Sequence, residues 1–323
     1  MNIPKISPVE GQIVVPDDAA LHAQAKRSRR LSGLVFALLS AALFSVKPVL
    51  IKLVYAYGVD TWTLMFLRMA MALPFVLLIA AHAFYQRREQ GIATDLSRRT
   101  LIQTAGLGLM VNYAAGFLDM LGLHYITAQF ERLIVFTYPT LVVLITVVIF
   151  KKPINSTVIT ALIICYIGLA IIFGHDLQTL GKDVLTGSGL VFMSATLFAI
   201  YFVLSKNVID RVGSRIFTFL TIAAATVAIA VHFSLVNDVS SLAQPAAVYG
   251  LILLISLTGT VFPLLLLAEA IARLGPARTS IAGGVGPIFT SVAAVLILGE
   301  AFTIYHGVGS ALIIAGVIMI ARR

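Results

Sequence analysis

The chain has 323 residues, of which 59% are hydrophobic and only 11% charged, and its mean hydropathy is +1.00. Soluble domains carry about 25% charged residues, so this composition excludes an ordinary soluble protein and indicates membrane-spanning segments. The net charge of +9 does not indicate a nucleic-acid partner, because the lysines and arginines lie in short clusters between apolar segments. The single cysteine, Cys165, excludes an intramolecular disulfide.

Residues 1–30 are polar, contain three prolines and end in the basic cluster Lys26-Arg27-Ser28-Arg29-Arg30. No apolar core comes before a cleavage site in this segment, so it does not have the pattern of a signal peptide. We expect a disordered cytoplasmic tail whose closing charges anchor the first span.

Apolar segments of about 20 residues then recur, which is the length needed to cross a hydrocarbon core of about 30 Å. They predict an all-α integral membrane protein with ten transmembrane helices. Pro48, Pro139, Pro263 and Pro287 weaken four of these helices, because proline removes a helical hydrogen bond. The predicted spans are residues 32–54, 61–84, 100–122, 126–150, 154–173, 187–206, 216–234, 246–271, 276–298 and 303–321.

The charges of the connecting loops predict the orientation, since lysine and arginine accumulate in cytoplasmic loops. With the N-terminus inside, the loops on the opposite side hold Lys182 but otherwise carry acidic residues. We therefore expect a multi-pass protein of the cell (inner) membrane with both termini in the cytoplasm. The cytoplasmic loops then hold Arg87, Arg88, Arg98, Arg99, Lys151, Lys152, Lys206, Arg211, Arg215, Arg273, Arg278, Arg322 and Arg323.

The second half of the chain repeats the first. Ser40-Ala-Ala-Leu-Phe matches Ser194-Ala-Thr-Leu-Phe, and Pro139 lies 148 residues before Pro287. The same shift of 148 places Ile167-Gly-Leu-Ala-Ile-Ile on Ala315-Gly-Val-Ile-Met-Ile. The predicted organisation is a tail (1–30), a first repeat (31–175) and a second repeat (176–323). Five spans in each copy give the two copies opposite orientations, as in many secondary transporters.

The chain resembles the drug/metabolite transporter superfamily, and within it the ten-span EamA-type members. Glu131-Arg132-Leu through Tyr138-Pro139 carries the resemblance in the first copy. In the second copy it is carried by Ala277-Arg278-Thr-Ser through Gly286-Pro287 and by Leu298-Gly299-Glu300. The first copy reads Phe150-Lys151-Lys152 where the second has Leu-Gly-Glu, so we expect no shared acidic role at Lys152.

The resemblance implies two inverted five-helix bundles around a central cavity, lined mainly by spans one, three, four, six, eight and nine. Family members export or import small solutes such as amino acids, drugs, sugars and nucleotide derivatives. A secondary transporter that moves a small metabolite by alternating access, in the export direction, is therefore the leading interpretation.

Candidate cavity residues lie on four of these spans. Lys47, beside Pro48, is positioned either to hold an anionic group or to snorkel to the outer interface. Asn112 and Asp119 share one face of the third span, whereas Glu131 and Tyr138 share one face of the fourth. Tyr201 of the sixth span falls opposite Lys47 in the repeat, so the substrate-binding candidates are Lys47, Asn112, Asp119, Glu131, Tyr138 and Tyr201.

A second set is expected to act in structure or coupling. Arg68 lies on the second span, which the family resemblance places away from the cavity, so we expect Arg68 to form a structural ion pair. Arg132 is expected to pair with Asp119, and Glu269 with Arg273 four residues on. Alternatively, Asp119 or Glu131 titrates during transport, since burial favours a protonated carboxyl. Pro139 either opens the backbone near the middle of the membrane or kinks its helix for packing. Pro287 ends the glycine-rich stretch 282–287, which allows close backbone approach or a flexible hinge.

The sequence favours no other class of protein. It has no Gly-x4-Gly-Lys-Ser/Thr motif for direct ATP use and no His-Glu-x-x-His or Gly-x-Ser-x-Gly pattern. We therefore expect no enzyme activity, no cofactor and no metal site. A membrane-embedded enzyme and a channel are the alternatives. The expected partners are a small-molecule substrate and the lipid bilayer, with a homodimer possible through the small residues Gly307, Ala311 and Ala315.

Overall fold

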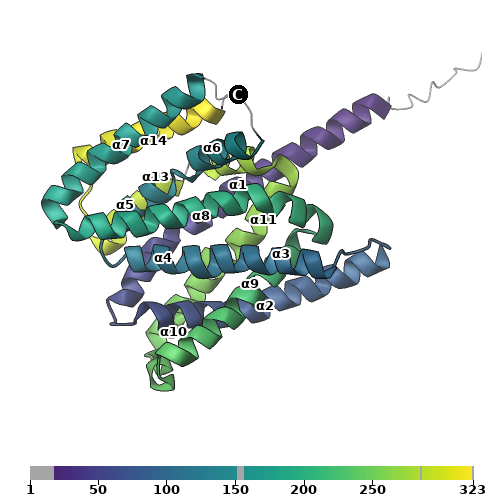
Figure 1. Cartoon of the computed structure of the whole chain (residues 1–323), viewed down its shortest axis with the longest axis horizontal. Helices are drawn as coiled ribbons and strands as arrows, with labels where there is room; N and C mark the ends of the chain where they lie inside the picture. The colour runs from purple at the N-terminus through teal and green to yellow at the C-terminus, as the bar shows by residue number, and fades with distance from the viewer. Residues whose placement is uncertain (1–17, 151–155, 284–285, 322–323) are drawn as a thin grey trace, which may run out of the picture.

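The computed structural model describes residues 18–150, 156–283 and 286–321, and these fold almost entirely into helices (Figure 1). Nine helical segments in this part of the chain are long and apolar enough to cross a membrane, and a shorter apolar helix covers Ile304–Met319. Together they account for the ten predicted spans. The predicted all-α membrane fold is confirmed. Lys151, Lys152, Arg322 and Arg323 of the orientation argument lie outside the described residues.

The first copy contains five spans, of which two are interrupted. The third consists of two α-helices joined by a π-helical segment, and the fourth is broken into two helices. In chain order, the helices are α1 (Asp18–Tyr55), α2 (Thr61–Glu89), α3 (Arg98–Gly108), η1 (Leu109–Ala115), α4 (Gly116–Gly122), α5 (Ala128–Val135), α6 (Tyr138–Phe150) and α7 (Ser156–Leu180).

The second copy repeats this order, and its third and fourth spans are interrupted in the same way. A short 3-10 helix, η2 (Val239–Leu242), precedes its third span. The remaining helices are α8 (Asp183–Val212), α9 (Ser214–Val236), α10 (Ala246–Ser256), η3 (Leu257–Val261), α11 (Phe262–Leu274), α12 (Pro276–Ala282), α13 (Gly286–Ala293), η5 (Ala294–Leu298) and α14 (Ile304–Ala321).

The first helix begins earlier than the sequence predicted. Residues 18–30, expected to be disordered, form the first turns of α1. Alanine, leucine, glutamine, lysine and arginine fill most of these positions, and all of them have high helix propensity. Asp18 adds a negative charge at the positive N-terminal end of the helix. The polar composition of the segment was therefore not sufficient evidence for disorder.

The two copies are packed into each other rather than side by side. Helix α1 of the first copy packs against α11 and α13 of the second, whereas α8 of the second packs against α4, η1 and α6 of the first. Helices α7 and α14 pair with each other at one edge of the molecule (Figure 1). The middle of the bundle is therefore an interface between the copies.

The π-helical segments occupy equivalent places, since η1 and η3 begin 148 residues apart. At the end of η1, and two residues after the end of η3, a backbone carbonyl lies within reach of a serine from the other copy. Ser40 donates to the carbonyl of Pro263 and Ser194 donates to that of Ala115, both at 2.8 Å. These four residues are themselves equivalent pairs in the repeat. The internal symmetry therefore extends to individual hydrogen bonds across the interface.

Glycines permit the close pairing of α7 and α14. A Cβ on Gly168 would lie 2.6 Å from the carbonyl oxygen of Gly309, and one on Gly316 would lie 2.5 Å from the Cys165 sulfur. Side chains at these glycines would therefore force the two helices apart. Ala311 and Ala315 of the predicted small-residue stripe are exposed on the outer side of α14.

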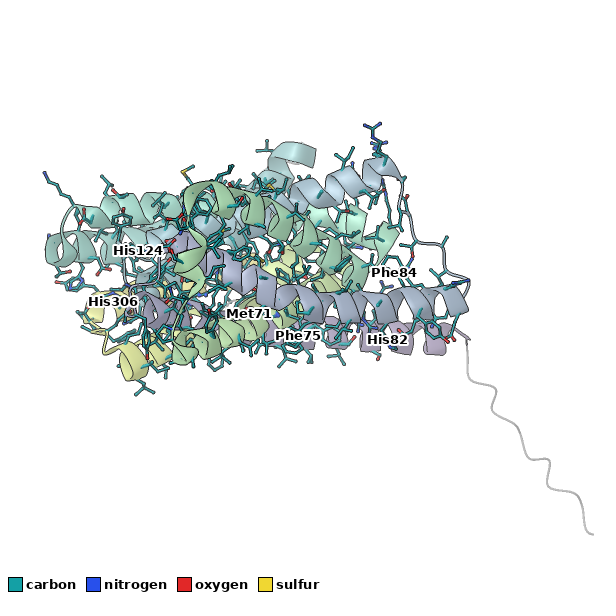
Figure 2. The ribbon with its side chains drawn as sticks, turned by 90° about the horizontal axis from the view of Figure 1, so that it is seen from below. Met71, Phe75, His82, Phe84, His124 and His306 are labelled. Atoms are coloured by element: carbon teal, nitrogen blue, oxygen red, sulfur yellow. The ribbon has the colours of Figure 1, made fainter. Side chains whose placement is uncertain are left out.

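The two ends of the bundle differ in charge. The end at which α2 and α8 finish and α3 and α9 begin carries Arg87, Arg88, Arg98, Arg99, Arg211 and Arg215, and we call it the basic end. Figure 2 shows His82 and Phe84 toward the basic end and His124 and His306 toward the opposite end.

Candidate functional site

A cavity lies between the two copies, lined by residues from spans one, two, three, four, six, eight and nine. It receives Lys47, Asn112, Asp119, Glu131 and Tyr138, which the sequence predicted as cavity residues. The lining side chains leave about 970 Å³ of space, part of it open to solvent. This space holds several water molecules.

Most of the lining follows the internal symmetry of the fold. When a residue of the first copy lines the cavity, its equivalent in the second copy usually does so too. The pairs are Ser40 and Ser194, Ala41 and Ala195, Phe44 and Phe198, Val111 and Gly259, Asn112 and Thr260, Gly116 and Leu264, Asp119 and Leu267, Glu131 and Thr279, Val135 and Gly283, and Tyr138 and Gly286.

The charges of the cavity break this symmetry. The charged lining residues, Lys47, Arg68, Asp119, Glu131 and Arg132, all come from the first copy. Asp119 and Glu131 are matched by the uncharged Leu267 and Thr279 of the second copy. The cavity is therefore polar on one wall and mostly apolar on the other, and the three cations exceed the two carboxylates by one charge when all are ionised.

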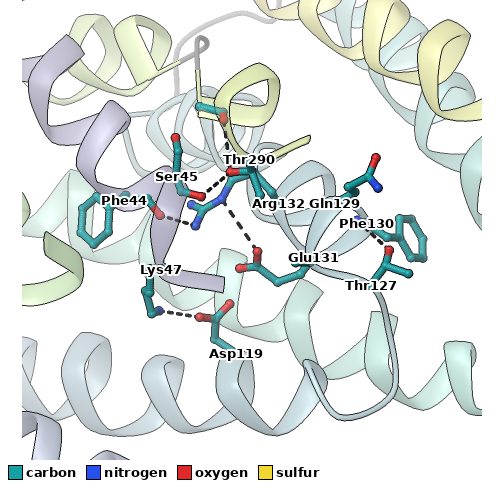
Figure 3. Close-up of polar contacts among 12 residues, drawn as sticks. Phe44, Ser45, Lys47, Asp119, Thr127, Gln129, Phe130, Glu131, Arg132 and Thr290 are labelled. Atoms are coloured by element: carbon teal, nitrogen blue, oxygen red, sulfur yellow. Dashed lines mark hydrogen bonds and ion pairs between the residues drawn. The ribbon is translucent and has the colours of Figure 1, made fainter. Parts of the chain in front are cut away.

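Lys47 and Asp119 form an ion pair with 2.6 Å between Nζ and Oδ2 (Figure 3). The side chain of Lys47 is 13% exposed and that of Asp119 is 7% exposed, so the pair is largely removed from solvent. This geometry corrects the predicted pairing of Asp119 with Arg132. The ammonium group of Lys47 thus has a partner within the protein, which was neither of the roles predicted for it.

Arg132 instead reaches across to α1. Its Nη2 donates to the backbone carbonyl of Phe44 at 2.6 Å (Figure 3). In a regular helix this carbonyl would accept from the residue four positions later, which is Pro48 and has no N–H. Pro48 therefore leaves an acceptor without a helical partner, and Arg132 supplies the donor. This physical reason explains why Arg132 does not turn toward Asp119.

Arg68 lies in the cavity wall, contrary to the prediction that it pairs off the cavity. Arg68 is 4% exposed, and the one hydrogen bond that its side chain makes to a described residue runs from Nη1 to Thr260 Oγ1 at 3.5 Å. Nε and Nη2 are buried with no hydrogen-bond partner among the described residues. Gly116 gives the guanidinium its space, because a Cβ there would lie 3.3 Å from Nη2.

Glu131 is 1% exposed and has a looser cationic partner than Asp119. Its Oε2 lies 3.8 Å from Nε of Arg132, and this oxygen accepts no hydrogen bond from a described residue. Asn112, also buried, has an amide nitrogen without a described partner. An unpaired buried polar group costs about 1–3 kcal/mol, so this wall has free hydrogen-bonding capacity where a solute or water can bind.

The two broken spans meet at Tyr138. Helix α5 ends at Val135 and α6 begins at Tyr138, directly before Pro139, while α12 ends at Ala282 and α13 begins at Gly286, directly before Pro287. Pro139 thus follows directly on the break in the fourth span, and Pro287 is the second residue of α13. Tyr138 donates its hydroxyl to the carbonyl of Ser280 at 3.0 Å, which ties one broken span to the other.

Gly283 makes this contact possible. A Cβ on Gly283 would lie 2.1 Å from the Tyr138 hydroxyl, which is far inside any allowed contact. The ring of Tyr138 packs between Phe136, Phe198 and Phe202 on the apolar side. Tyr138 is therefore held by aromatic contacts at its ring and by the Ser280 carbonyl at its hydroxyl.

Three predicted residues lie outside the described lining. Tyr201 is 2% exposed and packs against Phe198 and Phe217, and its neighbour Phe202 faces the cavity instead. Pro139 is also not among the lining residues, although Pro287 is. Glu269 is the third and lies near the basic end.

Glu269 pairs with Arg273 as the sequence predicted, with 3.0 Å between Oε2 and Nη2. The pair joins three helices, because Ser214 of α9 donates to Glu269 and Arg273 donates to Ser32 Oγ of α1 at 2.7 Å. The guanidinium also lies over the ring of Phe36, 4.5 Å from its centroid. This network holds α1, α9 and α11 together at the basic end.

At the opposite end, Glu300 links the two copies. Its carboxylate accepts from the backbone N–H groups of Ala128 at 2.7 Å and Gln129 at 3.1 Å, the first residues of α5. A carboxylate at a helix N-terminus is stabilised by the unpaired N–H groups and by the helix dipole. The acidic residue of the Leu298-Gly299-Glu300 motif therefore caps the helix that carries Glu131 and Arg132.

His124 closes the same end. Its ring stacks on Tyr55 with centroids 3.8 Å apart, and its Nε2 lies 3.0 Å from Thr61 Oγ1. Burial, and to a smaller extent the nearby charge of Lys52, lowers the pKa of His124 below its ordinary value. The imidazole is therefore neutral near pH 7, which suits an aromatic layer between the ends of α1 and α4.

Comparisons with known proteins agree with this architecture. The family model described as the EamA-like transporter family matches residues 31–174 and again residues 185–322. The chain is similar to "Uncharacterized transporter YcbK" of Bacillus subtilis (strain 168), with 24% identity over 290 residues that cover 88% of this chain and 91% of the relative. A solved crystal structure shares its fold, with a TM-score of 0.64 and 14% identity over 90% of this chain and 96% of that one. The chain is thus a multi-pass membrane protein that belongs to the EamA-like transporter family.

Proposed function

We propose that this protein is a secondary transporter that exports a small anionic metabolite by alternating access. The observation that carries the proposal is Arg68, a buried guanidinium in the cavity wall with two nitrogens unpartnered among the described residues. The other two cations of the cavity have partners, Asp119 for Lys47 and the Phe44 carbonyl for Arg132. Arg132 keeps one buried nitrogen, Nε, without a hydrogen-bond partner among the described residues, against two on Arg68, so Arg68 is the cation with the most capacity for a solute.

The chemistry of the wall supports a carboxylate or a similar planar anion as the bound group. A guanidinium presents N–H groups in a fixed fork that matches carboxylate geometry. The amide of Asn112 and the hydroxyl of Thr260 also line the cavity and offer further hydrogen bonds. The rest of the solute would lie against Phe44, Phe198 and Phe202 on the apolar side. Space for several waters corresponds to a solute the size of an amino acid or a small organic acid.

The broken spans support a mechanism in which the two repeats rock against each other. Helix interruptions at membrane depth are tolerated where the backbone lines a cavity. Here the interruptions before Pro139 and Pro287 lie on either side of the Tyr138–Ser280 hydrogen bond, which joins the two copies. In this proposal the Tyr138–Ser280 hydrogen bond breaks and forms again as the opening of the cavity changes from the cytoplasmic side to the outer side. The basic end faces the cytoplasm, and both termini lie on that side.

Glu131 is the proposed site of proton coupling. Its carboxyl is buried and its distance of 3.8 Å from Arg132 is long for an ion pair, whereas Asp119 is held at 2.6 Å by Lys47. Protonation of Glu131 would remove its attraction for Arg132, which would then be held by the Phe44 carbonyl alone. Deprotonation would draw the Arg132 guanidinium back toward Glu131. Transport into proteoliposomes should therefore respond to a pH gradient, and Glu131→Gln should abolish that response while equilibrium exchange of labelled solute continues.

The function is tested in two stages on purified full-length protein. Thermal-shift screening against L-amino acids, mono- and dicarboxylates and their amide or ester analogues identifies a solute. Counterflow of that labelled solute into preloaded proteoliposomes then measures transport. Saturable counterflow is expected of a carrier. A linear, non-saturable flux would indicate a channel, and chemical conversion of the solute would indicate an enzyme.

A further inference from the structure

A second polar cluster lies away from the cavity, where α7 ends and α14 begins. It contains His175 and Asp176 from α7 and His306 from α14. One nitrogen from each histidine and one oxygen from the carboxylate lie within 4.8 Å of one another. None of the three residues lines the central cavity. Figure 2 shows His306 toward the end of the bundle opposite to the basic end.

The cluster is buried but incompletely paired. Asp176 is 2% exposed and His306 is 4% exposed. Oδ2 of Asp176 and Nε2 of His306 have no hydrogen-bond partner among the described residues. A buried carboxylate needs a counter-charge, because removing it from water without one costs several kcal/mol or more. No lysine or arginine of the described chain forms an ion pair with Asp176.

The two imidazoles converge on one oxygen atom. Nδ1 of His175 lies 3.0 Å from Oδ1 of Asp176, and Nε2 of His306 lies 3.5 Å from the same atom. A tetrahedral metal ion with bonds of about 2.0–2.1 Å separates its ligand atoms by about 3.4 Å. The observed separations are close to this value on both sides of the carboxylate. A small rotation of the side chains would bring all three donors to one ion.

Neighbouring residues hold both rings in place. Nδ1 of His306 lies 2.8 Å from the hydroxyl of Thr303, so its Nε2 is the nitrogen that faces Asp176. Metal-binding histidines are commonly oriented in this way by a hydrogen bond to the other ring nitrogen. His175 stacks on Tyr305, with ring centroids 4.6 Å apart. Thr303 and Tyr305 both lie within three residues before His306, so one short segment positions both histidines.

We propose that His175, Asp176 and His306 bind a divalent transition-metal ion of the zinc class, with two imidazole nitrogens and one carboxylate oxygen as ligands. Imidazole suits zinc, copper, iron and nickel, and three protein ligands leave a fourth position for water. The His175 side chain is 18% exposed, which gives the ion a path from solvent. The bound ion cross-links the fifth span to the tenth and fixes them as one unit beside the moving helices.

A proton is the simpler occupant. Each neutral imidazole carries one N–H, so both histidines can donate to Oδ1 of Asp176 when each holds its hydrogen on the nitrogen that faces the carboxylate. A metal ion instead binds all three side chains through lone pairs on their donor atoms, so added metal distinguishes the two occupants. The sequence did not suggest this site, because its ligands are an adjacent pair and a residue 130 positions away rather than a spaced motif.

Cobalt binding tests the proposal directly. Untagged full-length protein in detergent is stripped with a chelator and titrated with Co²⁺, and bound metal is measured by elemental analysis and by visible absorption. We expect about one Co²⁺ per chain, displaced by Zn²⁺, and a rise in the unfolding temperature of about 5 °C at roughly 100 times the Kd. Asp176→Asn and His306→Ala should lose the bound cobalt and the temperature rise. His82→Ala, an exposed histidine near the basic end, should keep both.

A ligand replacement separates metal binding from misfolding. His306→Cys offers a thiolate in place of the imidazole, so its cobalt complex should gain a sulfur charge-transfer band in the near ultraviolet. The proposal is overturned if the wild-type protein binds no more Co²⁺ than the His175→Ala/Asp176→Asn/His306→Ala variant. It is also overturned if the unfolding temperature of stripped protein depends on pH through this cluster but not on metal, because the occupant is then a proton. Neither result bears on transport by the central cavity.

Discussion

Arg132 of the fourth span donates a hydrogen bond to the backbone carbonyl of Phe44 in the first span, at 2.6 Å. This is the carbonyl that Pro48 deprives of its helical partner. Pro48 therefore leaves a carbonyl of the first span without a helical donor, and the charged side chain of Arg132 on the fourth span is held by that carbonyl. Three features noted separately in the sequence, Pro48, Glu131 and Arg132, meet here.

Restoring the missing N–H should disturb this anchor without harming the fold. In Pro48→Ala, the N–H of residue 48 competes with Arg132 for the Phe44 carbonyl, so counterflow should fall about tenfold as a charged hydrogen bond of about 1.5–3 kcal/mol weakens. The unfolding temperature should stay the same or rise, because an interior proline is removed. Pro74→Ala, an exposed proline inside α2, is the control and should leave counterflow unchanged. Equal loss in both variants would refute the role of Pro48.

The Lys47–Asp119 pair should matter most when it is broken on one side. Asp119→Asn leaves a largely buried ammonium without its counter-charge and should destabilise the protein by about 3–5 kcal/mol. The double variant Lys47→Met/Asp119→Leu removes both charges and should recover most of this loss while remaining poor in transport. Denaturant unfolding in detergent measures the difference.

The Lys206–Asp210 pair provides the control for this experiment. Asp210 in this pair is 51% exposed, so Asp210→Asn should change stability by less than about 1 kcal/mol. If Asp119→Asn is as mild as Asp210→Asn, the Lys47–Asp119 pair is open to water during most of the transport cycle.

At the contact between Gly283 and Tyr138, removing the tyrosine hydroxyl should reverse the damage caused by adding a side chain to the glycine. Gly283→Ala places a Cβ 2.1 Å from the Tyr138 hydroxyl and should cost about 1–3 kcal/mol and slow counterflow. Adding Tyr138→Phe removes the hydroxyl and leaves the nearest ring carbon at 3.4 Å, an ordinary contact, so the double variant should regain the stability of Tyr138→Phe alone. Gly250→Ala, with no neighbouring heavy atom within 4 Å, is the neutral control. Failure of the rescue would mean that Gly283 acts through backbone flexibility.

The sequence was sufficient to predict the fold because the signals for the fold are spread over many residues, so no single residue decides them. Ten apolar segments, and a shift of 148 that aligns Pro139 with Pro287, define the spans and their internal repeat. The π-helical segments were not predictable, since nothing in their composition distinguishes Leu109–Ala115 from the rest of its span. The helical start of α1 was missed because a polar segment with good helix formers reads as exposed whether or not it is folded.

The site was predicted by residue type but not by pairing. Asn112, Asp119, Glu131 and Tyr138 were placed on the cavity by helical spacing and Lys47 by its position beside Pro48, and all five line it. The partner predicted for Asp119 was wrong because the prediction considered only the adjacent third and fourth spans, whereas Lys47 of α1 also lies within reach. Arg68 was set aside because of its span, and its contact with Gly116 of the third span is visible only in the structure. Tyr201 was placed by repeat alignment alone, and its neighbour Phe202 lines the cavity instead.

Arg68 provides the most direct measurement, because it tests which group of the solute the cavity recognises. Binding of a carboxylate solute and of its neutral amide is compared in the wild-type protein, in Arg68→Gln and in Arg215→Gln, an arginine at the basic end outside the cavity. The wild type and Arg215→Gln should favour the carboxylate by about 10- to 100-fold, the equivalent of a hydrogen bond to a charged group of about 1.5–3 kcal/mol. Arg68→Gln should bind the two solutes equally. An Arg68→Gln protein that keeps the wild-type Kd for the carboxylate would contradict the proposed site.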